Sequence, residues 1–228
     1  MSDTGPPGGR QRLSLRTSRL EAFSDGVFAI AATLLVLDLA IPSVREGDVG
    51  HQLYVQWPTY LAYLVSFLSI GQAWLNHSVI TEYLDRADPI LLRLNLMLLF
   101  FVSLLPFPTH MLAEYLSSQD AERVAVTVYG LNLFLISAFT SLMWHYALAE
   151  HLVREGGTEE DRRALTAKLD PSLMSYAFAI GLGLWRPKAA VILYLAIALF
   201  VIIPFRTVIR GIRRRERRAG TAPPPEAR

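Results

Sequence analysis

The polarity pattern along the chain is dominated by long apolar stretches that carry no Asp, Glu, Lys or Arg. Asp, Glu, Lys and Arg are absent from residues 26–37, 52–81, 94–113, 124–149 and 189–205. A membrane-spanning helix needs about 20 consecutive, mostly apolar residues, and several of these stretches are that long. A soluble amphipathic helix would instead carry a polar face that recurs about every 3.6 residues. The pattern therefore predicts an all-α integral membrane protein.

Six spanning helices are predicted from the positions at which the apolar character begins and ends. The expected spans cover about residues 19–41, 52–76, 90–112, 122–148, 172–185 and 188–209. Pro42 cannot continue the first helix, and Pro106 and Pro108 should kink the third or end its regular part. The fifth span is short for a bilayer, so a re-entrant pair formed by the last two spans remains an alternative.

The ends of the chain differ in composition from the six-helix domain, which is expected over residues 16–210. Residues 1–15 are rich in Gly, Pro, Ser and Arg, which is typical of a flexible tail, and residues 211–228 form a basic, Pro-rich tail. In a six-span topology, 18 of the 22 Lys and Arg residues lie on the side of the two termini. Basic residues concentrate on the cytoplasmic side. Both termini are therefore expected in the cytoplasm, and the protein in the plasma membrane.

A juxtamembrane basic cluster follows the last span, from Arg206 to Arg218. Such clusters anchor the topology of a membrane protein, and they also attract anionic lipid. The sequence leaves both interpretations open, a plain anchor and a lipid-binding tail.

Composition excludes several other classes of function. The chain contains no cysteine, so disulfides and thiolate metal sites are absent, and its net charge of +2 is too small to indicate nucleic-acid binding. His145 and His151 are not spaced as a helical metal pair, and the chain has neither a phosphate-binding glycine loop nor a serine nucleophile motif. We therefore expect neither an enzyme nor a fixed metal or cofactor site.

The first span carries the most unusual polar residue. Asp25 lies inside a predicted spanning helix, and an ionisable group at membrane depth normally marks a function. A carboxylate at the interface that merely caps or anchors the helix is the alternative.

Helical periodicity sorts the first span into two faces. One face carries Asp25 and small or apolar residues, namely Ala29, Ala32 and Val36. It is suited to close helix packing around a buried carboxylate. The other presents a ladder of Gly26, Ile30, Thr33 and Leu37. Around a shared axis the ladder would form an apolar constriction with one polar ring, and such constrictions gate by dewetting. Alternatively, the ladder packs against helices of its own subunit.

Several motifs in the first half of the chain resemble those of one known family. The first predicted span of this chain opens with Arg19-x-x-x-Phe23-Ser24-Asp25, and the second contains Trp74-Leu-Asn-His77. The third contains Arg93-Leu-Asn95, followed by Pro106-Phe-Pro108-Thr109. Together they resemble the bacterial branch of the endosomal/lysosomal potassium channel family, transmembrane protein 175 type. The likeness covers about residues 16–112 closely.

The resemblance implies a homotetrameric potassium channel, in which the first helices of six-helix subunits line a central pore permeated by K⁺. Ile30 would form the narrow apolar constriction, Thr33 a hydroxyl ring one turn deeper, and Leu37 a further apolar ring. A structural or gating network would join the first three spans through the motif residues, namely Arg19, Phe23, Ser24, Asp25, Trp74, His77 and Asn95.

Two other functions remain open on the sequence. A proton-coupled secondary transporter could use Asp25 and His77 as a relay, although carriers normally show two related halves, and no internal repeat is evident. A non-conducting membrane scaffold is the third class. Thr127-Val-Tyr-Gly130 is similar to a potassium-filter loop, but it lies within a continuous apolar stretch, whereas a filter needs extended backbone there. It is therefore not expected to form a filter.

Overall fold

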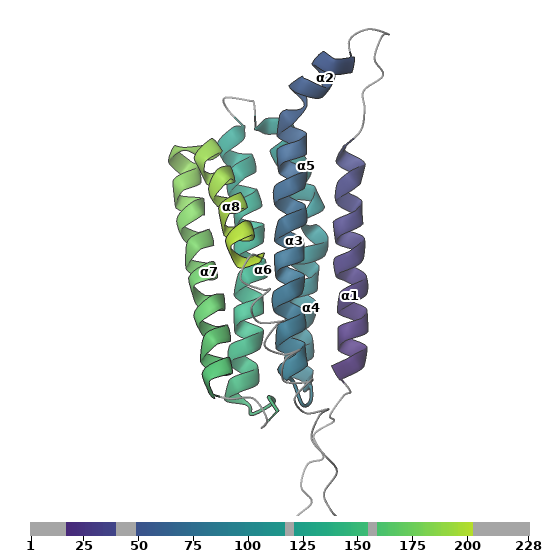
Figure 1. Cartoon of the computed structure of the whole chain (residues 1–228), viewed down its shortest axis with the longest axis vertical. Coiled ribbons are helices and arrows are strands. Elements are labelled where there is room, and N and C mark those ends of the chain that lie inside the picture. Colours follow the sequence, from purple (N-terminus) through teal and green to yellow (C-terminus); the bar gives the residue numbers. More distant parts are fainter. Residues whose placement is uncertain (1–16, 40–48, 117–120, 155–158, 203–228) are drawn as a thin grey trace, which may run out of the picture.

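The computed structural model describes residues 17–39, 49–116, 121–154 and 159–202, which are helical apart from short turns and one isolated β-bridge. The helices are α1 (Thr17–Leu34), the 3-10 helix η1 (Leu35–Asp38), α2 (Val49–Val55), α3 (Trp57–Tyr83), α4 (Pro89–Leu104), α5 (Pro106–Tyr115), α6 (Glu122–Ala149), α7 (Glu159–Trp185) and α8 (Pro187–Ile202). The long helices run side by side in one bundle, with α1 at one edge and α7 at the other (Figure 1). Both expected tails, Pro42 and the basic cluster after Arg206 lie outside the described residues.

Within the described residues, three helical segments are long and apolar enough to cross a membrane. They are Thr17–Leu37, Pro89–Tyr115 and Glu122–Ala149, and a shorter apolar helix covers Pro187–Phe200. The prediction of an all-α protein with membrane-spanning helices is confirmed at this level.

The second expected span differs from the structure at both ends. Residues 52–55 belong to the separate short helix α2, and α3 begins at Trp57 with Pro58 in its first turn, where proline is favoured. At its other end α3 continues past residue 76 to Tyr83. The polar residues His77 and Thr81, which lie in this continuation of the helix, are buried inside the protein. The polar side chains in the last turns of α3 therefore lie at contacts between helices, and they do not mark the end of the membrane span.

The third expected span is divided at Leu105, as the prolines predict. Because Pro106 has no amide hydrogen, it cannot donate to Val102, and the amide of Leu105 instead donates to the carbonyl of Val102 at 3.2 Å in a tighter turn. Helix α5 then starts at Pro106 and continues toward the end of the bundle near α2 (Figure 1).

The fifth expected span is the part of the fold that the sequence describes least well. Helix α7 begins at Glu159, well before residue 172, and Pro171 lies within it. Its charged first half carries an exposed pair within the helix, Arg163 with Glu159 at 3.2 Å, and is joined to α6 by the Trp144 indole, which donates to Thr166 Oγ1 at 2.9 Å. In Figure 1, α7 extends over the height of the bundle, and α8 packs beside its upper half.

The core of the bundle is closely packed where α6 meets α8. Gly130 on α6 lies against the hydroxyl end of the Tyr194 phenol ring on α8, and a Cβ atom at this position would overlap the hydroxyl oxygen and also crowd Ile180. Tyr129 packs against the same ring, with 5.6 Å between the centroids. Because Gly130 has no side chain, the large side chain of Tyr194 fits against α6 at this position.

One end of the bundle is fastened by contacts between connecting segments. Leu84, after α3, forms an antiparallel β-bridge with Val153, after α6. Close by, Asp88 caps α4 by accepting from the amide of Leu91 at 2.8 Å, and its other carboxylate oxygen accepts from the Tyr146 hydroxyl at 2.6 Å. These contacts hold α3, α4 and α6 together near the start of α1 (Figure 1).

Candidate functional site

Helix α1 lies at the edge of the subunit and packs mainly against α3 and α4 (Figure 1). The buried residues of α1 and the η1 turn that continues it are Leu20, Ser24, Phe28, Ala31 and Leu35. The expectation that Asp25, Ala29, Ala32 and Val36 form the tightly packed face is wrong for the single subunit, because Asp25, Ala29 and Val36 are exposed. The buried stripe is rotated by about one residue. Large side chains such as Leu20 and Phe28 remove more apolar surface from solvent than alanine does.

A chain of hydrogen bonds joins α1, α3 and α4 behind this buried face. Asn95 on α4 donates from Nδ2 to Ser24 Oγ on α1 at 3.1 Å, and its Oδ1 lies 2.9 Å from His77 Nε2 on α3. All three side chains are buried. Because a carbonyl oxygen can only accept, His77 donates from Nε2 in this arrangement.

The imidazole of His77 is also packed against the first helix. Its ring centroid lies 5.5 Å from that of Phe28, with the two rings tilted. His77 is therefore held on one edge by Asn95 and on one face by Phe28. These contacts fix how α1 packs against α3 and α4.

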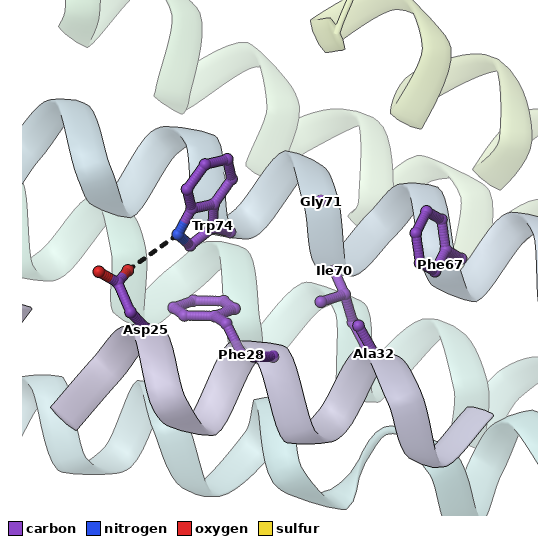
Figure 2. Close-up of a pocket in the computed structure, with 8 residues that line it drawn as sticks. Asp25, Phe28, Ala32, Phe67, Ile70, Gly71 and Trp74 are labelled. Carbon is purple, nitrogen blue, oxygen red and sulfur yellow. Dashed lines mark hydrogen bonds between the residues drawn. The ribbon is translucent and has the colours of Figure 1, made fainter. Parts of the chain in front are cut away.

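A second polar pair lies on the exposed side of the same helices. The indole of Trp74 on α3 donates to Asp25 Oδ1 on α1 at 2.9 Å, and both side chains are exposed within the subunit. Figure 2 shows this pair at one end of a groove between α1 and α3 that continues to Phe67. The groove has a volume of about 410 Å³, and its lining is apolar apart from Asp25 and the indole nitrogen. The carboxylate of Asp25 thus faces an open, mostly apolar surface.

The motif residues Arg19 and Phe23 do not join this network within the subunit. Arg19 is exposed, and Phe23 is 56% exposed. Among the described residues, the structure records no hydrogen bond or ion pair of the Arg19 side chain. The expected seven-residue network therefore consists of the Ser24–Asn95–His77 chain and a separate Asp25–Trp74 pair.

A polar cavity of about 270 Å³ adjoins both the Ser24–Asn95–His77 chain and the Asp25–Trp74 pair. The sequence predicted only part of its lining. The cavity is lined by Glu21, Asp25, His77, Ser78, Thr81, Glu82 and Arg154. Glu21 precedes Asp25 by one helical turn, a spacing that places both on the same side of a helix. No sequence signal connects Arg154 to this place, because it follows α6. The cavity brings charges of both signs next to His77.

The proposed pore residues face away from the subunit. Ile30 is 61% exposed and Leu37 is 71% exposed, and Thr33 between them is also exposed. The hydroxyl of Thr33 donates to the carbonyl of Ile30 at 2.9 Å. The alternative that this ladder packs on helices of its own subunit is therefore wrong, and its place in a pore stays a prediction.

Neither a carbonyl filter nor a metal site competes with this region in the described part of the chain. Thr127–Gly130 lies within α6, as predicted, and Tyr129 there is fully buried, with its hydroxyl 3.0 Å from Ser66 Oγ. Across residues 17–39, 49–116, 121–154 and 159–202, no group of His, Asp and Glu is arranged to hold a metal ion.

Comparison with known proteins places the chain among ion channels. A family model described as the endosomal/lysosomal potassium channel TMEM175 matches residues 19–106. A protein of Streptomyces collinus named a potassium channel is 43% identical over 169 residues, which cover 73% of this chain and 82% of the relative. The human protein named endosomal/lysosomal proton channel TMEM175 is 32% identical over 92% of this chain and 46% of its own length.

A solved structure agrees with these sequence matches. The crystal structure of a lysosomal potassium-selective channel TMEM175 homolog from Chamaesiphon minutus superposes with a TM-score of 0.75 at 34% identity. The superposition covers 83% of this chain and 97% of that protein. On the identity, the coverage and the shared fold, this chain belongs to the TMEM175 family of endosomal/lysosomal potassium channels.

Proposed function

We propose that this chain is the subunit of a potassium-permeable membrane channel in which α1 lines the pore. Relatives from Streptomyces collinus and Chamaesiphon minutus are named potassium channels, and both are more than 40% identical to this chain. The observation that carries the proposal is the exposed ladder of Ile30, Thr33 and Leu37, on a helix whose opposite face is packed and hydrogen-bonded. As a member of a channel family, the protein is not an enzyme.

A symmetric assembly explains why α1 lies at the edge of the subunit. Exposed large apolar side chains on α1 and η1 include Ile30, Leu34 and Leu37. Copies of this helix around a common axis would turn the ladder toward one another, as in cyclic oligomers. We propose a homotetramer. Each subunit would contribute six spans: α1, α3, α4 with α5, α6, α7 and α8.

The orientation in the membrane follows from the basic residues. Helices α1, α4 and α7 begin, and α6 ends, at the same end of the bundle (Figure 1). By position in the chain, Arg19, Arg86, Arg154 and Arg163 belong to these helix ends or lie within three to five residues of them. This end would face the cytoplasm under the positive-inside rule, with both termini there and the protein in the plasma membrane. The basic tail after α8 would then meet the anionic inner leaflet.

The ladder would form the gate and the narrowest part of the pore. Rings of Ile30 and Leu37 would exclude water from the axis when they are close together. Between them, Thr33 offers oxygen lone pairs, since its hydrogen is donated to the Ile30 carbonyl. A dehydrating K⁺ ion could exchange water oxygens for these hydroxyl oxygens.

Proton transport is the second candidate function. The animal relatives are named proton channels, and Asp25 and His77 line the same 270 Å³ cavity. A carrier that uses these two residues would move protons by a relay, independently of the ladder on α1.

Flux through the purified protein in liposomes tests both functions. Under a K⁺ gradient, Ile30→Asn should raise K⁺ flux, because a polar side chain would wet the constriction. Ile192→Asn is a matched control, since Ile192 on α8 is 64% exposed, as open to the surroundings as Ile30. Flux that rises equally in both variants would remove Ile30 from the pore.

The same liposomes distinguish a channel from a relay. A channel would carry K⁺ in the wild-type protein, and neither Asp25→Asn nor His77→Gln would remove the effect of Ile30→Asn on K⁺ flux. Absence of K⁺ flux in every folded form, together with proton flux lost in those two variants, would favour the proton-coupled carrier.

A further inference from the structure

Helix α3 carries a stripe of polar side chains on its interior side. Ser66, Ser69, Gln72 and Asn76 recur every three or four residues, and all four are buried. They face α5, α6 and α7 in the middle of the bundle. No solvent water reaches a bilayer core, so each polar atom needs a partner inside the protein.

Three members of the stripe have such partners. Ser66 Oγ lies 2.8 Å from Thr109 Oγ1, and Ser69 Oγ donates to the Val65 carbonyl at 2.8 Å. Gln72 accepts from the Tyr176 hydroxyl at 3.2 Å and also contacts Ser172 on α7.

Asn76 is the exception in the stripe. Its side chain is only 5% exposed, and its Oδ1 has no hydrogen-bond donor in the part of the chain that the structure describes. An unsatisfied buried acceptor of this kind is unfavourable, so native structures normally provide a partner.

A small cavity lies beside this orphan acceptor, between α3, α6 and α7. Its volume is about 20 Å³, and its lining comprises Ser69, Gln72, Ala73, Asn76, Leu133, Ile136, Ser137, Thr140 and Tyr176. A cavity needs at least about 10–15 Å³ and two to four polar partners to hold a water molecule. The space beside Asn76 meets both conditions.

Three hydroxyl groups of the polar lining have no free hydrogen. The hydroxyl hydrogens of Ser69, Thr140 and Tyr176 are already donated, to the Val65 carbonyl, the Ile136 carbonyl and the Gln72 amide oxygen. These hydroxyl oxygens and Asn76 Oδ1 can therefore only accept. Water brings two hydrogens, so it can donate both to Asn76 Oδ1 and to one of these hydroxyl oxygens.

We propose that an ordered water molecule occupies this cavity and donates to Asn76 Oδ1 and to a hydroxyl oxygen of Ser69 or Thr140. The water belongs to the interior of the single subunit and is separate from the ion path along α1. A cation could also satisfy acceptors, but no carboxylate lines the cavity, and an unneutralised buried charge is strongly unfavourable. The water completes the polar contact through which α7 packs against α3 and α6.

A structure of the full chain in lipid nanodiscs, at a resolution that reveals ordered water, tests the proposal directly. We expect a density peak within hydrogen-bond distance of Asn76 Oδ1. It should be lost in Asn76→Leu and retained in Asn132→Leu. Asn132 on α6 is the matched control, because its Oδ1 is also buried without a recorded partner, yet it does not line the cavity.

A second data set separates water from a bound cation. Replacing K⁺ by Tl⁺ should leave the peak at its original height, whereas a bound monovalent cation would be replaced by the far heavier ion. A peak that strengthens with Tl⁺ would overturn the proposal in favour of a cation. An empty cavity in the wild-type map would overturn it outright, even if Asn76→Leu does not fold.

Discussion

His77 Nε2 on α3 lies 2.9 Å from Asn95 Oδ1 on α4, and the other end of the same amide donates to Ser24 on α1. One side chain thus joins three helices through both of its polar atoms. Asn95 and its partner Ser24 are far apart in the sequence, at a separation of 71 positions. The hydrogen bonds of Asn95 hold α1, whose outer face is exposed, against the rest of the subunit.

Asn95→Ala should therefore destabilise the subunit. It would leave the Ser24 hydroxyl and the His77 imidazole buried without their partner, at a cost of about 1–3 kcal/mol. Thermal unfolding of the purified protein in detergent measures the loss. Thr33→Ala is the control, because the Thr33 hydroxyl is exposed and bonds only within its own helix. Equal melting temperatures for the two variants would contradict a stabilising role for Asn95.

Gly130→Ala should also destabilise the bundle, for a steric reason. The new methyl group would meet the ring of Tyr194, and overpacking of this kind typically costs about 1–3 kcal/mol. Gly181→Ala is the matched control on α7, because no atom lies within 4 Å of its Cβ position. That substitution should raise stability slightly, since alanine is the better helix former.

A double variant locates the origin of the Gly130 effect. If the clash is with the phenol, Tyr194→Leu should recover part of the stability lost in Gly130→Ala, which a double-mutant cycle would register as coupling. Additive effects of the two changes would place the strain elsewhere.

Cysteine labelling can test the pore assignment without removing native thiols, because the chain contains no cysteine. A charged, water-soluble thiol reagent should react with Thr33→Cys in the open channel and block most of the K⁺ flux. Ile192→Cys, on the exposed side of α8, should keep its flux after the same treatment. Inhibition that is equal in both variants would show that the reagent acts away from α1.

The position of α6 was predictable because its apolar run is flanked by charge on both sides. The expected span of 122–148 compares with Glu122–Ala149 in the structure. The start of α7 was not predictable in the same way. Its first half is charged and lies against α6 through contacts such as that of Trp144 with Thr166, which only the folded chain reveals.

The buried face of α1 was assigned incorrectly for a reason that applies to membrane helices generally. In water, periodic polarity marks the side that faces solvent. In lipid, both the packed and the exposed side are apolar, so Phe28 and Ile30 look alike in the sequence although only Phe28 is buried. The family motif identified Ser24, His77 and Asn95 as important, but their pairing required the three-dimensional structure.

The β-bridge between Leu84 and Val153 constrains how the subunit can move. It joins the residues just before α4 to those just after α6, so the intervening chain is closed at one point. Because the bridge holds the two ends of this segment together, a tilt of α4 relative to α6 would pivot near it. Displacements would then be smallest beside the bridge and largest toward the opposite end of the bundle, near α2 (Figure 1).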